Sequence, residues 1–128
     1  MNLAAELRRK LANAIGSTDW HTALEAVPRE LFLGDAVYRY EPERGWTPVR
    51  RSEMSTDDWL ALAYTDETWV TQIDGVMAED AAGPVVIVRP TSSSTFPGLI
   101  VLMLEAAGIS EGDRALEIGT GPAWDLPA

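Results

Sequence analysis

Residues 114–121 read Arg114-Ala115-Leu116-Glu117-Ile118-Gly119-Thr120-Gly121, a short run that leads into a Gly-Thr-Gly turn. The run before the glycines predicts a buried β-strand over residues 114–118. Glycines directly after such a strand let the backbone turn sharply and bring its N–H groups within reach of a ligand carboxylate or phosphate. A Gly-x-Gly pattern alone is weak evidence, and a tight turn that binds nothing is the alternative.

The segment before this strand favours an α/β fold. Residues 98–107 are apolar almost throughout, which predicts a helix packed against a sheet, and Pro97 suits its first turn. Residues 111–113 predict a turn. Helix, turn, strand and glycine turn in this order open a doubly wound α/β unit. We therefore predict an α/β fold, with an N-terminal helical and hairpin region over residues 1–90 and the start of a Rossmann-like domain over residues 91–128.

The N-terminal region is predicted to begin with helices. Apolar residues recur every fourth position over residues 2–15, which predicts an amphipathic helix with Asn2 at its start and Gly16 at its end. A second helix is predicted to begin at residue 17 or 18 and to stop before Pro28. The type of residues 29–40 stays open. Residues 55–58, Ser-Thr-Asp-Asp, predict the capped start of a third helix ahead of residues 59–63.

Strands and loops are expected between and after these helices. Residues 68–73 and 85–88 are rich in strand formers and predict two antiparallel strands, joined by a small acidic loop. Residues 41–53 are polar and contain Pro and Gly, which predicts a surface loop, with a hairpin around Gly45 as an option. Residues 91–95, Thr-Ser-Ser-Ser-Thr, predict a polar loop.

Composition excludes several classes of function. The 128 residues carry a formal net charge of −10, which argues against nucleic acid and anionic membranes as partners. The chain has no cysteine and a single histidine, so we expect no metal site, and Cys-based catalysis is excluded. The longest apolar run, residues 99–104, is far shorter than the roughly 20 residues of a membrane-spanning helix. A soluble, cytoplasmic protein is expected.

Five short blocks resemble, in order, those of the protein-L-isoaspartate O-methyltransferase family, in particular its actinobacterial members. They are residues 27–32, 64–66, 70–72, 94–97 and 115–121. The last block looks like the first S-adenosyl-L-methionine-binding motif of class I methyltransferases. The resemblance implies transfer of a methyl group from S-adenosyl-L-methionine to an isoaspartyl or aspartyl carboxylate of a protein or peptide, in the service of protein repair or peptide maturation.

The resemblance also implies roles for individual residues. Thr95 matches the hydroxyl of a Ser-x-Pro element at the family's active site, and a helix N-cap is the alternative role for it. The cofactor motif falls on Glu117, Gly119, Thr120 and Gly121, although Glu117 could instead be a solvated acid at a strand end. The family's substrate contacts fall on Val70, Thr71 and Gln72.

In the family, further strands and helices follow the glycine motif, whereas this sequence ends at Ala128. We therefore expect an incomplete, C-terminally truncated S-adenosyl-L-methionine-binding portion. The leading prediction is a carboxyl O-methyltransferase of the protein-L-isoaspartate type or its N-terminal part. The alternative is a catalytically inactive remnant or protein-interaction module, which self-association into a homo-oligomer would favour.

Overall fold

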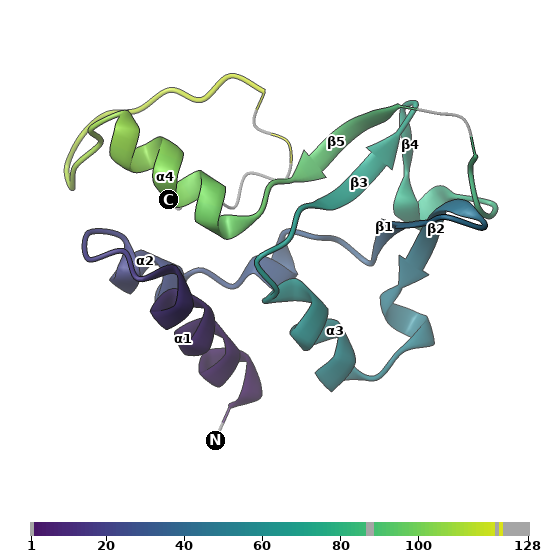
Figure 1. The fold of residues 1–128 in the computed structure, drawn as a ribbon, viewed down its shortest axis with the longest axis horizontal. Coiled ribbons are helices and arrows are strands. Elements are labelled where there is room, and N and C mark those ends of the chain that lie inside the picture. Colours follow the sequence, from purple (N-terminus) through teal and green to yellow (C-terminus); the bar gives the residue numbers. More distant parts are fainter. Residues whose placement is uncertain (1, 87–88, 120, 122–128) are drawn as a thin grey trace.

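The computed structural model describes residues 2–86, 89–119 and 121, which combine α-helices with a five-stranded antiparallel sheet. Helices α1 (Leu3–Ile15) and α2 (His21–Ala26) lie beside α4 (Pro97–Ala106) at one end of the molecule, and the sheet lies at the other (Figure 1). Helix α3 (Thr56–Ala63) packs between α1 and the sheet. The coarse prediction of a mixed α/β fold is confirmed.

The first helix has the predicted caps, whereas the second begins later than predicted. The Asn2 side chain accepts a hydrogen bond from the Ala4 N–H at 3.0 Å, and Gly16 ends α1 with a left-handed φ of 72°. The buried Ser17 hydroxyl accepts from the Trp20 N–H at 3.1 Å and donates to Glu105 of α4 at 2.7 Å. These bonds hold residues 17–20 in a turn, so α2 starts only at residue 21.

The segment left open by the sequence forms a 3₁₀ turn, Arg29–Leu31, followed by strand β1, Ala36–Glu41. Strand β1 pairs with β2, Gly45–Arg50, in an antiparallel hairpin. The prediction of a surface loop over residues 41–53 is therefore wrong, while the optional hairpin around Gly45 is present. Pro48 fits in β2 because this strand lies at the edge of the sheet, where a missing N–H is tolerated.

Strand β3, Trp69–Ile73, is present as predicted and is the hub of the sheet. It pairs with β1, with the short β4 (Val76–Met77) and with β5 (Pro90–Ser94). The prediction of a loop over residues 91–95 is wrong because a strand at the sheet edge tolerates exposed Ser and Thr side chains. The predicted strand over residues 85–88 is reduced to one bridge between Val85 and Trp46, and residues 87 and 88 lie outside the described part.

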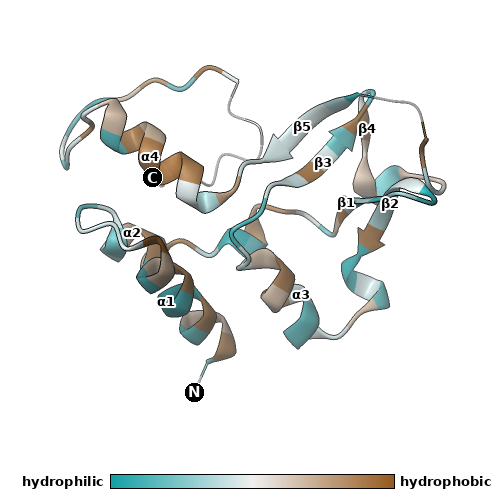
Figure 2. Ribbon diagram, viewed as in Figure 1, coloured by the Kyte–Doolittle hydropathy of each residue, from teal (hydrophilic) through white to brown (hydrophobic). Residues whose placement is uncertain are grey.

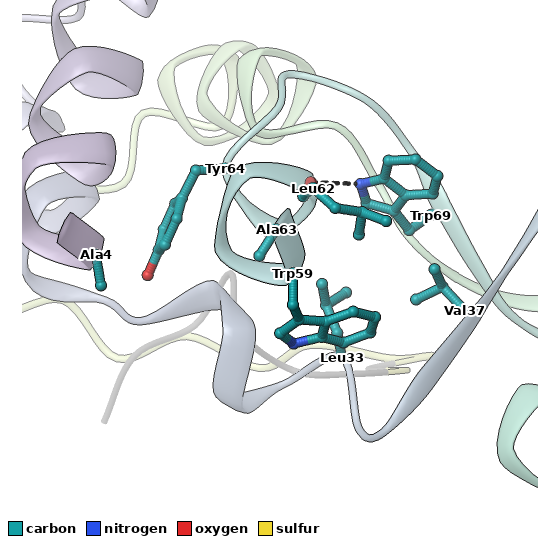
Figure 3. Close-up of a cluster of buried hydrophobic side chains, with 8 residues drawn as sticks. All are labelled: Ala4, Leu33, Val37, Trp59, Leu62, Ala63, Tyr64 and Trp69. Carbon is teal, nitrogen blue, oxygen red and sulfur yellow. Dashed lines mark hydrogen bonds between the residues drawn. The ribbon is translucent and has the colours of Figure 1, made fainter. Parts of the chain in front are cut away.

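Aromatic side chains fill the core between α3 and the sheet. Trp59 of α3 is 1% exposed and packs with Leu33, in the turn before β1, and with Val37 of β1 (Figure 3). The Trp69 indole N–H donates to the Leu62 carbonyl at 3.0 Å, so this buried polar group is paired (Figure 3). The predicted capped helix start at residues 55–58 is confirmed, and the cap is Ser55, whose hydroxyl accepts from the Asp58 N–H at 3.1 Å.

Helix α4 has nearly the predicted length but a different neighbour. Its buried side chains, Ile100 and Val101, pack against Ala12 and Leu24 of α1 and α2, and not against a sheet. The turn at residues 111–112 is present. The predicted strand over residues 114–118 is absent, and Leu116 and Ile118 are 88% and 91% exposed. A strand needs at least one neighbouring strand to pair with, and the described residues supply none for residues 114–118, so they do not form the Rossmann-like start.

Helices of the described segments are all too short or too polar to cross a lipid bilayer.

Candidate functional site

A hollow lined by hydroxyl groups lies between β5 and the glycine turn. Its volume is about 480 Å³, and its walls are Pro90, Thr91, Ser92, Ser93, Thr95, Gly119 and Gly121. None of these side chains carries a charge. After α4 the chain runs back towards β5, which brings the glycine turn to this place (Figure 1). Two of the predicted groups, Thr95 and the glycines, are therefore close together although more than twenty positions separate them.

Thr95 stands at the step from β5 to α4 and is not the helix cap. The N-cap is Phe96, whose side chain caps nothing, so the alternative N-cap role of Thr95 is wrong. The helix start is held instead by the loop between α3 and β3, where the Thr68 hydroxyl accepts a hydrogen bond from the Phe96 N–H at 3.0 Å. Among the described residues the Thr95 hydroxyl has no hydrogen-bond partner, and it is therefore available to a ligand.

Asp66 caps α4 from the same loop. Its Oδ1 accepts a hydrogen bond from the Gly98 N–H at 2.7 Å. A Cβ on Gly98 would lie 2.8 Å from the other carboxylate oxygen, so a larger residue there would displace the Asp66 carboxylate. The carboxylate at the start of the helix also satisfies the helix dipole. Asp66 thus fixes the first turn of α4, which begins two positions after Thr95.

Arg29 lies beneath the step that carries Thr95. It is 1% exposed, and its guanidinium donates to the Ser94 carbonyl at 3.1 Å and to the Ser94 hydroxyl at 3.3 Å. The same group donates to the carbonyls of Ala63, Thr65 and Glu67 at 2.8 to 3.1 Å. Burial lowers the pKa of Arg29 to about 10, which leaves it charged at neutral pH. Arg29 therefore ties β5 to the loop between α3 and β3.

A second hollow adjoins the first and takes in part of the predicted substrate loop. Its volume is about 440 Å³, and Thr71, Gln72, Ser92 and Gly121 line it together with apolar side chains and Glu79. Ser92 and Gly121 border both hollows. Val70 lines neither hollow, because its side chain packs in a core cluster with Ala36 and Tyr38.

Hydrogen bonds fix the amide of Gln72 at this junction. The Thr91 hydroxyl donates to Gln72 Oε1 at 2.9 Å and accepts from the Gly75 N–H at 3.1 Å. The Gln72 amide nitrogen lies 3.7 Å from the Met77 sulfur. Gln72 is therefore held against β5, at the boundary between the two hollows.

The structure describes three of the four residues predicted to hold S-adenosyl-L-methionine, and it does not place them after a buried strand. Gly119 and Gly121 have left-handed φ values of 76° and 56°, as a glycine turn requires. The turn follows an exposed irregular segment instead of a buried strand, and Gly121 lies against β5, where an added Cβ would be 3.4 Å from the Ser92 hydroxyl. Glu117 is half-buried on this irregular segment, and Thr120 lies outside the described residues.

The sequence analysis missed the groups that hold the site in place. The resemblance placed Thr95, Thr71 and Gln72 at a site, but it assigned no role to Arg29, Asp66 or the serines of β5. Arg29 and Asp66 do lie within two of the five blocks, but Arg29 stands next to Glu30, and nothing in its local pattern marked it as buried. No signal revealed that the Ser run pairs as a strand.

Comparison of the chain with protein-family models, with curated proteins and with solved structures gives no match.

Proposed function

We propose that this chain binds the acceptor carboxylate of isoaspartyl or aspartyl peptides, as the substrate-side part of a carboxyl O-methyltransferase of the protein-L-isoaspartate type. One observation carries the proposal: the hydroxyl-lined hollow joins Thr95 to the glycine turn and adjoins the hollow of Thr71 and Gln72. These are three of the segments for which the sequence resemblance implies substrate or cofactor contacts.

The chemistry of the hollow suits a carboxylate. An ionised carboxylate accepts several hydrogen bonds, and each bond to a charged group contributes about 1.5–3 kcal/mol. Thr95, Ser92 and Ser93 offer hydroxyl donors, and the lining contains no carboxylate that would repel the ligand. In a methyl transfer to a carboxylate the acceptor oxygen must be held in one orientation, because positioning supplies much of the rate. Holding that oxygen is the role proposed for this chain.

A matched pair of variants tests the proposal. Calorimetric titration with an isoaspartyl hexapeptide should give a binding isotherm that is lost when asparagine replaces the isoaspartyl residue. Thr95→Val should weaken the binding about tenfold or more, since one hydrogen bond to an ionised group is removed. Thr22→Val, an isosteric change at an exposed position of α2, should leave it unchanged. Equal affinities for the two peptides would refute the proposal.

Exposed apolar side chains favour a second candidate, a protein-interaction module. Leu102 and Met103 of α4 are 61% and 54% exposed, and Figure 2 shows hydrophobic colouring over most of that helix. Leu116 and Ile118 add to the exposed apolar surface. Light scattering distinguishes the two readings: a stable oligomer that a Leu102→Ser, Met103→Ser variant abolishes, with no peptide binding, would favour the interaction module.

Titration with S-adenosyl-L-methionine tests the cofactor separately. Because the glycine turn follows an irregular segment instead of a buried strand, the chain is expected to give no binding isotherm with S-adenosyl-L-methionine while it binds the acceptor peptide. Binding of S-adenosyl-L-methionine would contradict this expectation and would show that the chain holds a working cofactor site.

A further inference from the structure

The second hollow differs in character from the hydroxyl-lined one and has no role in holding a carboxylate. Its apolar wall consists of Leu31, Phe32, Leu33 and Met77, and Glu79 stands at its rim. Leu31 is 72% exposed, an unusual exposure for a large apolar side chain that lines a hollow. The two hollows share Ser92 and Gly121, so a short peptide that places its carboxylate in one extends directly into the other.

Glu79 gives this hollow a negative edge. The Glu79 carboxylate lies against Gly34, where a Cβ would come within 2.9 Å of its Oε1. In the described part of the chain Glu79 forms no ion pair within 4.0 Å. Glu79 also lines a separate hollow together with Arg50 and Arg51, where Arg50 pairs with Glu53 at 3.7 Å. The carboxylate is therefore available to a cation from a ligand.

We propose that the second hollow selects the acceptor peptide, taking a large apolar side chain next to the isoaspartyl or aspartyl residue and a lysine or arginine beyond it. This inference rests on the proposed function, since the carboxylate in the first hollow sets the register of the peptide. The apolar wall binds the hydrophobic side chain, and Glu79 pairs with the basic one. The net charge of −10 acts in the same direction, because it disfavours peptides with further acidic residues.

A panel of isoaspartyl hexapeptides tests the selection by calorimetric titration. In the reference peptide a leucine flanks the isoaspartyl residue on each side, and a lysine lies beyond each leucine. Replacing leucine by serine should weaken binding about fivefold, and replacing lysine by glutamate about threefold or more, as expected for a half-exposed apolar contact and a surface ion pair. Raising the salt concentration from 0.05 to 0.5 M should remove most of the lysine effect and leave the leucine effect.

Two pairs of variants assign these effects to the hollow. Glu79→Gln should abolish the discrimination between lysine and glutamate, whereas Glu43→Gln, an exposed change in the β1–β2 turn, should preserve it. Leu31→Ser should abolish the preference for leucine, whereas Leu102→Ser on α4 should preserve it. All four positions are exposed, so the variants are expected to fold.

The outcomes separate this inference from the proposed function. Binding that depends on the isoaspartyl carboxylate but not on leucine or lysine would overturn the selection and leave the proposed function standing. Equal discrimination in Glu79→Gln and wild type would overturn the role of Glu79. Binding that is indifferent to the isoaspartyl carboxylate, or absent, would overturn both.

Discussion

Replacing Arg29 by alanine is expected to destabilise the protein by about 3–4 kcal/mol. Three of the acceptors of its guanidinium lie in fully buried bonds: the Ala63 carbonyl, the Ser94 carbonyl and the Ser94 hydroxyl. Each would lose its donor without access to water, at a cost of about 1 kcal/mol or slightly more. The carbonyls of Thr65 and Glu67 are only partly buried and can bond water instead. The sum is a large share of a typical stability of about 5–15 kcal/mol.

Urea unfolding followed by tryptophan fluorescence measures this loss. Arg29→Lys keeps the charge but lacks the planar fork of donors, so it is expected to lose at least half as much as alanine. Arg44→Ala is the control, because Arg44 is 60% exposed and pairs with Glu41 only at the surface, where a change under about 0.5 kcal/mol is expected. A loss below about 1 kcal/mol for Arg29→Ala would refute the argument that this guanidinium holds β5 to the α3–β3 loop.

Three further changes are expected to alter stability. The pKa of the Tyr64 phenol is raised by burial and by its hydrogen bond to Glu30, so the stability that this group contributes is present below pH 10 and is lost as the pH rises further. Urea midpoints measured from pH 8 to 11 should therefore show a smaller alkaline loss in Tyr64→Phe than in the wild type. Asp66→Ala should cost about 1 kcal/mol in the same assay, because the start of α4 loses its cap. Gly45→Ala should cost about 2 kcal/mol or more, since φ is 81° and the new Cβ would lie 2.5 Å from the Val85 carbonyl oxygen.

Controls accompany these changes. Equal alkaline slopes in wild type and Tyr64→Phe would show that another group governs the loss. Asp66→Asn keeps an oxygen acceptor for the Gly98 N–H and should lose less than Asp66→Ala. Gly83→Ala should be nearly neutral, because nothing lies within 4 Å of its new Cβ, and a Gly45→Ala variant of equal stability would contradict the close approach at the hairpin.

Local patterns predicted the elements whose cause is local. Asn2 and Gly16 cap α1 as the sequence indicated, and α3 starts within the predicted segment 55–58, with Ser55 as its cap. Strand β3 follows from its own strand formers. In these cases the residue that fixes the element is within a few positions of it, so the sequence contains the whole cause.

Tertiary pairing decided the elements that the sequence did not predict. The Ser run of β5 is a strand only because β3 offers it an edge, and residues 114–118 are irregular because no described strand pairs with them. The arrangement of the site also depends on tertiary contacts, since Arg29 joins segments up to 65 positions apart. Side-chain hydrogen bonds over such separations leave no periodic trace in a sequence, so the resemblance indicated Thr95 but not the groups that hold it.

Amide chemical-shift mapping with the isoaspartyl hexapeptide tests most directly that the hollow between β5 and the glycine turn binds an acceptor carboxylate. In the labelled protein the largest shifts are expected at residues 91–95 and at Gly119 and Gly121, with small shifts in α1 and the β1–β2 hairpin. They should disappear with the asparagine counterpart of the peptide. Shifts confined to the exposed face of α4, or equal shifts with both peptides, would contradict the account.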